Sequence, residues 1–153
     1  MALCAARRQN ILGRMIKLVI VDPHSLVREA LQKRLETAVG LEIVGSTGRY
    51  EDALQQTRLL APDVILLETK APGGLQTLQT LRRLCPACAV IVLTSYPDSQ
   101  EEDQARQMGA ASYLLKTLDT KSLVGEIRTV ARRMENRPDD GVVPSGGEAT
   151  ALR

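Results

Sequence analysis

Aromatic residues are scarce in this sequence: they make up 2% of the chain, as three Tyr with no Phe and no Trp. Proteins that bind single-stranded nucleic acid stack bases on such rings, so the composition argues against a nucleic-acid platform. No apolar run approaches the roughly 18 residues that a membrane-spanning helix needs. The glycine-rich phosphate loops G-x-x-x-x-G-K-[ST] and G-x-G-x-x-G are missing as well, which argues against a nucleotide enzyme.

The net charge of +2 at pH 7 does not describe the body of the chain. Arg7, Arg8 and Arg14 carry three positive charges within residues 1–14, which contain no acid. The remaining residues are close to neutral, so we expect no direct binding of nucleic acid by this domain. The three cysteines fit free thiols in a reducing compartment, which indicates the cytoplasm.

With 153 residues the chain suits one domain of ordinary size. We expect residues 1–15 to form an N-terminal extension, either disordered or upstream of a true start at Met15. Residues 16–134 are expected to fold. Residues 135–153 contain no apolar periodicity and are interpreted as a disordered tail or linker, too short for a helix-turn-helix. Either the domain stands alone, or an output domain has been lost.

Short, β-branched apolar runs alternate with segments of helical spacing from Lys17 onward, which predicts an α/β fold. The runs are continuous, as in strands buried on both faces, and cover residues 17–22, 42–46, 63–68, 89–94 and 112–116. In the first intervening segment, a single helix face is predicted to contain Leu26, Val27, Ala30, Leu31 and Leu35. Strict alternation implies a five-stranded parallel sheet with helices on both faces.

In such a sheet the functional site lies beyond the carboxyl ends of the strands. Acids, hydroxyls and lysines follow the predicted strands, and a site is therefore expected from Asp22, Pro23, His24, Glu68, Thr69, Lys70, Thr94, Ser95 and Lys116. An acid, a hydroxyl and an ammonium at one edge could hold a phosphoryl group.

These residues, in this order, resemble the receiver domain of two-component response regulators, most closely the LuxR-type receivers. The resemblance rests on LVIVD at 18–22 with His24, PDVILL at 62–67, VIVLTS at 90–95, and Gly109-Ala110 with YLLK at 113–116. It implies a flavodoxin-like (βα)5 fold with strand order 2-1-3-4-5. It also implies a signalling module rather than an enzyme, with Thr94, Tyr113 and Lys116 as the switch and phosphoryl-contact residues.

The sequence departs from the family's pattern where the chemistry takes place. Pro23 replaces one member of the acidic pair that holds Mg²⁺, and Glu68 stands at the position of the phosphate-accepting Asp. Lys70 adds a positive charge where the metal would approach. With Asp22 and Glu68 as the remaining carboxylates, we expect no bound metal or only weakly bound Mg²⁺. Glu68 also displaces its carboxylate by about 1 Å, which disfavours phosphate transfer.

The switch and phosphoryl-contact residues Thr94, Tyr113 and Lys116 all match the family's pattern. Two interpretations of Glu68 are therefore open. Its permanent negative charge could act as a partial mimic of a phosphorylated side chain, reaching Lys116 or Thr94 directly. Alternatively, Glu68 is functionally silent and forms an ion pair with Lys70 or Lys116. In either case we expect the pair to lie at a solvent-open strand end.

Two further features have simpler explanations. Cys85 and Cys88 form a C-x-x-C motif, which allows a small redox protein as a remote alternative, but they follow a helix rather than open one. They are therefore expected to be incidental free thiols. His24 has no paired nucleophile and is expected to pack at a helix start.

The sequence thus predicts a phosphorylation-independent receiver module. The alternative is a conventional phosphoacceptor that regulates transcription through a missing or separate DNA-binding domain. Expected partners are a sensor kinase, an output protein or a second copy of the chain. A homodimer would use the helix at 120–134, where Arg128, Arg132 and Arg133 lie on the predicted outer side.

Overall fold

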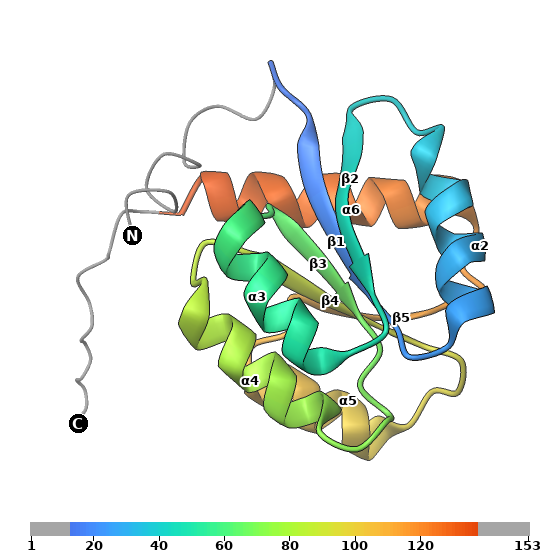
Figure 1. Cartoon of the computed structure of the whole chain (residues 1–153), viewed down its shortest axis with the longest axis vertical. Helices are drawn as coiled ribbons and strands as arrows, with labels where there is room; N and C mark the ends of the chain where they lie inside the picture. Colours follow the sequence, from blue (N-terminus) through green and yellow to red (C-terminus); the bar gives the residue numbers. More distant parts are fainter. Residues whose placement is uncertain (1–12, 138–153) are drawn as a thin grey trace.

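The computed structural model describes residues 13–137 (Figure 1). Strands and helices alternate from the first strand to the last helix. The strands are β1 (Ile16–Val21), β2 (Leu41–Thr47), β3 (Val64–Leu67), β4 (Ala89–Thr94) and β5 (Ser112–Leu115). The helices are α2 (Ser25–Glu36), α3 (Tyr50–Leu60), α4 (Gly74–Leu84), α5 (Ser99–Gln107) and α6 (Thr120–Glu135). The predicted strands are therefore confirmed to within one residue at each end.

All neighbouring strands pair in parallel, and the sheet has the order β2-β1-β3-β4-β5. This is the predicted flavodoxin-like arrangement of five strands and five helices. Because β1 and β3 lie side by side at the centre, the residues that follow them emerge together at one edge of the sheet. The register of the β1–β2 pair shifts between Leu18 and Val19, whereas β1 and β3 pair without interruption.

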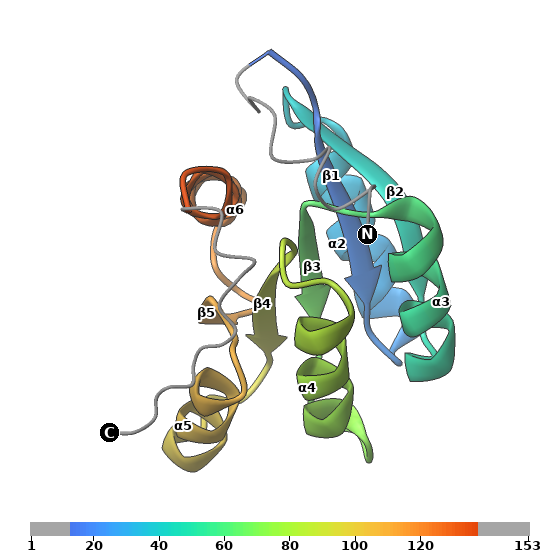
Figure 2. The same ribbon diagram turned by 90° about the vertical axis from the view of Figure 1, so that its left-hand side faces the viewer.

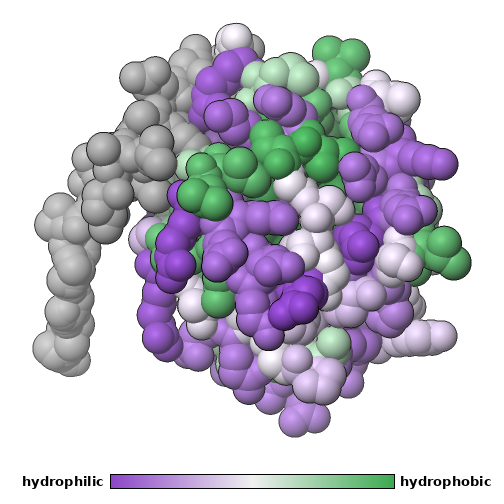
Figure 3. Space-filling model, viewed as in Figure 1, coloured by the Kyte–Doolittle hydropathy of each residue, from purple (hydrophilic) through white to green (hydrophobic). Residues whose placement is uncertain are grey.

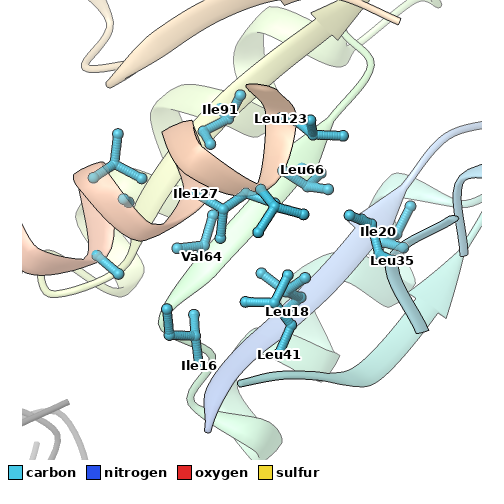
Figure 4. Packing of buried hydrophobic residues seen from close by; sticks show 14 of the residues in the cluster. Ile16, Leu18, Ile20, Leu35, Leu41, Val64, Leu66, Ile91, Leu123 and Ile127 are labelled. Atoms are coloured by element: carbon cyan, nitrogen blue, oxygen red, sulfur yellow. The ribbon is translucent and has the colours of Figure 1, made fainter. Parts of the chain in front are cut away.

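Successive side chains of a strand point to opposite sides of the sheet. Because the strands are nearly continuous apolar runs, both faces of the sheet are apolar. On one face, α2 and α6 cover a buried cluster that includes Leu18, Ile20, Leu35 and Ile127 (Figure 4). On the other face, helices α3, α4 and α5 cover residues such as Val19. In Figure 2, α6 lies on one side of the sheet and α3 and α4 on the other. Burial on both faces explains the continuous apolar runs.

The amino-terminal turn of α2 does not pack as its sequence pattern suggests. Leu31 and Leu35 are buried, but Leu26 is 79% exposed and Val27 is also exposed. Ala30 is exposed as well, so the prediction that this helix face is core was right for Leu31 and Leu35 and wrong for its other three residues.

The loop from β3 to α4 is held close to its own helix by two glycines. Gly73 has φ of 89°, a left-handed conformation that glycine adopts readily. A Cβ on Gly74 would clash with the backbone of Thr69. A larger residue at 74 would therefore push α4 away from the loop that follows Glu68.

The described residues extend a little beyond the segment 16–134 that is predicted to fold. Arg14, assigned to the N-terminal extension, forms an ion pair of 3.2 Å with the buried Asp63 at the foot of β3. At the other end, α6 continues to Glu135. The rest of both predicted terminal segments, residues 1–12 and 138–153, lies outside the described residues.

Hydrophilic side chains predominate on the face shown in Figure 3, and hydrophobic ones gather in a band across its upper part. Among the described helices, none is both long and apolar enough to span a membrane. On α6, Arg132 and Arg133 are exposed as expected. Arg128 is half-buried instead, and it donates a 2.5 Å hydrogen bond to the backbone carbonyl of Val39.

Candidate functional site

The carboxyl edge of the sheet brings together the residues predicted to form a site. Asp22 directly follows β1, Glu68 follows β3, Thr94 ends β4 and Lys116 follows β5. The strand order makes β1, β3, β4 and β5 consecutive neighbours. Residues separated by up to 94 positions therefore meet at one edge.

Lys116 lies between the two acids. Its Nζ is 2.6 Å from Oδ2 of Asp22 and 2.6 Å from Oε1 of Glu68. The side chains of both acids are 3% exposed, and that of Lys116 is 10% exposed. The expectation of an ion pair at a solvent-open strand end was wrong, because the flanking loops cover the three groups. Two carboxylates and one ammonium give this buried trio a net charge of about −1 in their ordinary ionisation states.

The second oxygen of each acid is also hydrogen-bonded. Oδ1 of Asp22 accepts the backbone N–H of His24 at 2.9 Å and lies 2.9 Å from Nδ1 of the same histidine. Oε2 of Glu68 accepts the backbone N–H of Lys70 at 2.7 Å. Burial acts to raise the pKa of Asp22, but the hydrogen bonds from Lys116 and His24 outweigh it, and the pKa lies below its usual value.

Tyr50, at the start of α3, is a site residue that the sequence patterns did not indicate. Its hydroxyl donates a 2.7 Å hydrogen bond to the backbone carbonyl of Glu68. Burial and the negative charges of Glu68 and Asp22 raise the pKa of Tyr50 to about 12. Tyr50 therefore holds the residue after β3 from the α3 side of the sheet.

Lys70 does not pair with Glu68 through its side chain. Its Nζ lies 2.7 Å from Oε1 of Glu101 in the first turn of α5, while Thr69 donates a 3.0 Å hydrogen bond to Oε2 of the same glutamate. Of the two lysines considered as ion-pair partners of Glu68, Lys70 and Lys116, the structure shows Lys116 in that role. Glu101 was missed because its sequence neighbours, all polar, are typical of an ordinary solvated helix.

Thr94 and Tyr113 lie at the same edge but have other partners. The Thr94 hydroxyl donates to the carbonyl of Tyr96 at 3.0 Å and accepts its N–H at 3.2 Å. The Tyr113 hydroxyl donates to Oε1 of Glu101 at 2.6 Å. Within residues 13–137, Glu68 is therefore hydrogen-bonded to Lys116 and to backbone, not to these two hydroxyls.

Asp22, His24 and Glu68 could in principle hold a cation, because one ligand atom of each lies within 4.8 Å of the others. Mg²⁺ prefers oxygen ligands in octahedral geometry and several waters. Here the four carboxylate oxygens accept hydrogen bonds, and the Lys116 ammonium lies against both acids. Pro23 offers no side-chain ligand beside Asp22. The residues therefore do not fit a Mg²⁺ ion in this arrangement, and weak Mg²⁺ binding stays a prediction.

Two arginines of α2 support the site from outside. Arg28 donates a 2.6 Å hydrogen bond to the carbonyl of Asp22. Arg34 donates to the carbonyls of Lys116 and Leu118 and to the hydroxyl of Thr120, at 3.1, 2.5 and 2.9 Å. Neither was recognised from the sequence, because an arginine on a helix is most often a solvated surface residue.

The C-x-x-C motif lies elsewhere. Cys85 and Cys88 are joined by a disulfide, with Cα atoms 5.4 Å apart and both side chains buried. The expectation of free thiols was therefore wrong for this pair, because the turn after α4 brings the two Cα atoms within disulfide range. The pair precedes β4, at the opposite edge of the sheet from Glu68, so it takes no part in the candidate site.

The comparison with known families agrees with this geometry. Residues 18–128 match the family described as Response regulator receiver domain. The chain is 37% identical over 118 residues to the response regulator GacA of Pseudomonas aeruginosa, covering 76% of this chain and 55% of GacA. It is 34% identical over 118 residues to the response regulator UvrY of Escherichia coli K12, covering 76% of this chain and 54% of UvrY. The chain thus spans about half the length of these curated relatives.

Solved structures give the same picture of the fold. The signal receiver domain of NarL from Mycobacterium tuberculosis superposes with a TM-score of 0.72 at 28% identity, covering 78% of this chain and 98% of that one. The REC domain of AraT, a response regulator from Geobacillus stearothermophilus, gives a TM-score of 0.69 at 26% identity, with 79% and 97% covered. Both likenesses span nearly the whole of the compared domain.

Proposed function

This chain belongs to the response regulator receiver domain family, and we propose that it signals without being phosphorylated, with Glu68 as a permanent, partial substitute for a phosphorylated aspartate. The observation that carries the proposal is the 2.6 Å contact between the carboxylate of Glu68 and the ammonium of Lys116. In the receiver domains that the chain resembles, the lysine at this position contacts the phosphoryl group.

Charge and reach support the substitution. A glutamate carries one negative charge, whereas a phosphorylated side chain carries about −1.5 to −2. The longer side chain of Glu68 spans the distance to Lys116 that a phosphoryl group would otherwise bridge. Burial strengthens the contact, because the low effective dielectric at a covered site screens a charge pair less than water does.

The same contacts disfavour phosphoryl transfer to Glu68. Transfer needs an in-line nucleophile and a cation that offsets charge on the transferring group. Both oxygens of Glu68 already accept hydrogen bonds, from Lys116 and from the Lys70 N–H. The residue after Asp22 is Pro23, so the second acid of the family's metal-binding pair is missing. Metal and nucleophile are therefore impaired together.

Glu68 is only a partial mimic of a phosphorylated aspartate. Of the three switch and phosphoryl-contact residues, it contacts Lys116 alone. Thr94 and Tyr113 bind Tyr96 and Glu101 instead. A ligand or charge shifts a conformational equilibrium only by its difference in interaction between the two states. One ion pair thus biases the domain toward a signalling state and leaves room for a partner to complete the shift.

Labelling with acetyl phosphate in the presence of Mg²⁺ tests phosphorylation independence. After incubation, the intact mass of the protein should be unchanged, and no slower band should appear on a phosphate-affinity gel. Incorporation at Glu68 would instead favour a conventional phosphoacceptor.

The proposed partners are a sensor kinase, an output protein or a second copy of the chain, in the cytoplasm where such kinases signal. For the homodimer we propose the outer side of α6, where Arg132 and Arg133 are exposed. Light scattering over a concentration series tests this pairing. A mass that stays at the monomer value up to high micromolar concentration would contradict it.

A further inference from the structure

The start of α5 contains an interrupted capping box. In a complete box, the side chain of the N-cap residue accepts backbone N–H groups of the first turn, and an acid three residues later accepts the N-cap N–H. Asp98 fulfils the first half, since its Oδ1 accepts the N–H groups of Gln100 at 2.9 Å and Glu101 at 3.1 Å. The spacing Asp98–Glu101 would also suit the second half.

In place of the second half of the box, a tyrosine from β5 connects the Asp98 N–H to the Glu101 carboxylate. The N–H of Asp98 donates to the hydroxyl of Tyr113 at 3.3 Å, and that hydroxyl donates to Oε1 of Glu101 at 2.6 Å. The tyrosine of β5 is thus inserted between the two groups that would otherwise bond to each other. We call the set of Asp98, Glu101 and Tyr113 the tyrosine-bridged box.

Glu101 connects this box to the loop after Glu68. Its carboxylate, with a side chain 11% exposed, also binds the ammonium of Lys70 at 2.7 Å and the hydroxyl of Thr69 at 3.0 Å. Burial acts to raise the pKa of Glu101, but the hydrogen bonds from Lys70, Tyr113 and Thr69 outweigh it and lower the pKa. Its negative charge in the first helical turn is favourable as well.

We propose that Glu101 is the residue that positions Tyr113, and that the tyrosine-bridged box is a two-state element. With Tyr113 in the box, the tyrosine is held against α5. When Tyr113 leaves, Glu101 closes the box on the Asp98 N–H, so that group does not lose its acceptor. The Asp98 N–H exchanges one acceptor for another, and the Tyr113 hydroxyl exchanges its bond to Glu101 for one to water, so the tyrosine can move at little cost.

The claim that movement of Tyr113 transmits a signal rests on the proposed function. The claim that Glu101 positions Tyr113 does not. In the proposed function Tyr113 is a switch residue, yet its hydroxyl is bound to Glu101 and not to Glu68. The two claims can therefore fail separately, and the experiment needs a variant for each.

Fluorine NMR of the 3-fluorotyrosine-labelled protein measures the position directly, because the chain contains only three tyrosines. Signals are assigned with Tyr→Phe variants. Glu101→Ala should shift the Tyr113 signal, and Glu101→Gln should restore most of its position because the amide oxygen still accepts a hydrogen bond. The matched control is Glu102→Ala, since Glu102 binds Arg106 through an exposed pair on the same helix. It should leave Tyr113 unchanged.

An unshifted Tyr113 signal in Glu101→Ala, or an equal shift in Glu102→Ala, would overturn the positioning role. If Glu101→Ala shifts the signal and Glu68→Gln does not, Glu101 positions Tyr113 but the proposed mimicry fails. A shift in Glu68→Gln without one in Glu101→Ala would support the mimicry and contradict the positioning role.

Amide hydrogen exchange at Asp98 tests the two-state part. In Tyr113→Phe, Glu101 can close the box, and the exchange rate should stay near that of the parent. In Tyr113→Phe/Glu101→Ala no acceptor remains, and exchange should be about five-fold faster, the effect of losing one ordinary hydrogen bond. Equal acceleration in the single and double variants would show that the box does not close.

Discussion

Arg34 in α2 donates a 3.1 Å hydrogen bond to the backbone carbonyl of Lys116, although the two residues are 82 positions apart. The same guanidinium binds the carbonyl of Leu118, in the loop that leads to α6, and the hydroxyl of Thr120, the first residue of α6. These contacts fix the backbone that carries the Lys116 ammonium. The contact between Lys116 and Glu68 therefore depends on a residue from a different layer of the fold.

Replacing Arg34 with Ala should loosen this loop without unfolding the domain. The loss of three hydrogen bonds is expected to cost about 1–3 kcal/mol of unfolding free energy in total, because water can replace the guanidinium at these partly buried acceptors. Amide hydrogen exchange at residues 116–120 should accelerate. Lys33→Ala, which removes a neighbouring exposed cation of α2, serves as the control. Unchanged exchange in Arg34→Ala would contradict the positioning role.

Alkaline titration should reveal two tyrosines with raised pKa values. Burial raises the pKa of Tyr50 and of Tyr113 from 10.0 to about 12, with added contributions from Glu68 at the first and Glu101 at the second. A raised pKa means that the folded state favours the neutral phenol. The corresponding stabilisation is complete below pH 10 and is lost as the pH rises from 10 toward 12.

Tyrosinate absorbance of the folded protein measures these steps, and chemical denaturation at each pH measures the stability. Tyr50→Phe and Tyr113→Phe should each remove one of the late ionisation steps. If either tyrosine ionised near pH 10 while the protein remained folded, the described burial and hydrogen bonding would be contradicted.

Restoring phosphorylation should require two substitutions together. Pro23→Asp returns the second acid beside Asp22, and Glu68→Asp shortens the side chain so that it no longer reaches Lys116 as closely. We expect the double variant to be labelled by acetyl phosphate with Mg²⁺, and each single variant to be labelled weakly, because metal and nucleophile must be in place at once. Calorimetry should show Mg²⁺ binding by the double variant and very weak binding by the parent. Strong labelling of either single variant would contradict this coupling.

Much of the site was predictable because strand ends place residues with little ambiguity. Once five buried parallel strands are recognised, Asp22, Glu68, Thr94 and Lys116 have to meet at one edge. Side-chain partners were not predictable in the same way. Lys70 could have turned to Glu68, and it binds Glu101 only because the first turn of α5 lies within its reach.

The wrong predictions concern features that depend on the three-dimensional surroundings of a residue rather than on its sequence pattern. Leu26 fits an apolar helix face, but within residues 13–137 nothing covers it, and it stays exposed. Cys85 and Cys88 were expected to be free thiols from the choice of compartment, whereas their pairing depends on the turn between them. Residues 1–12 and 138–153, interpreted as an extension and a tail, lie outside the described structure.

The central claim, that the charge of Glu68 holds Lys116 as a phosphoryl group would, is tested most directly by amide NMR of Glu68→Gln. The substitution removes the charge while the amide oxygen can still accept a hydrogen bond, and it relieves repulsion with Asp22, so the unfolding free energy should change by only about 1–2 kcal/mol. Glu51→Gln, at an exposed position of α3, controls for the loss of one charge. The account predicts shifts concentrated at Lys116 and Tyr113 in Glu68→Gln, and their absence in Glu51→Gln. A Glu68→Gln spectrum that matches the parent at both residues would contradict it.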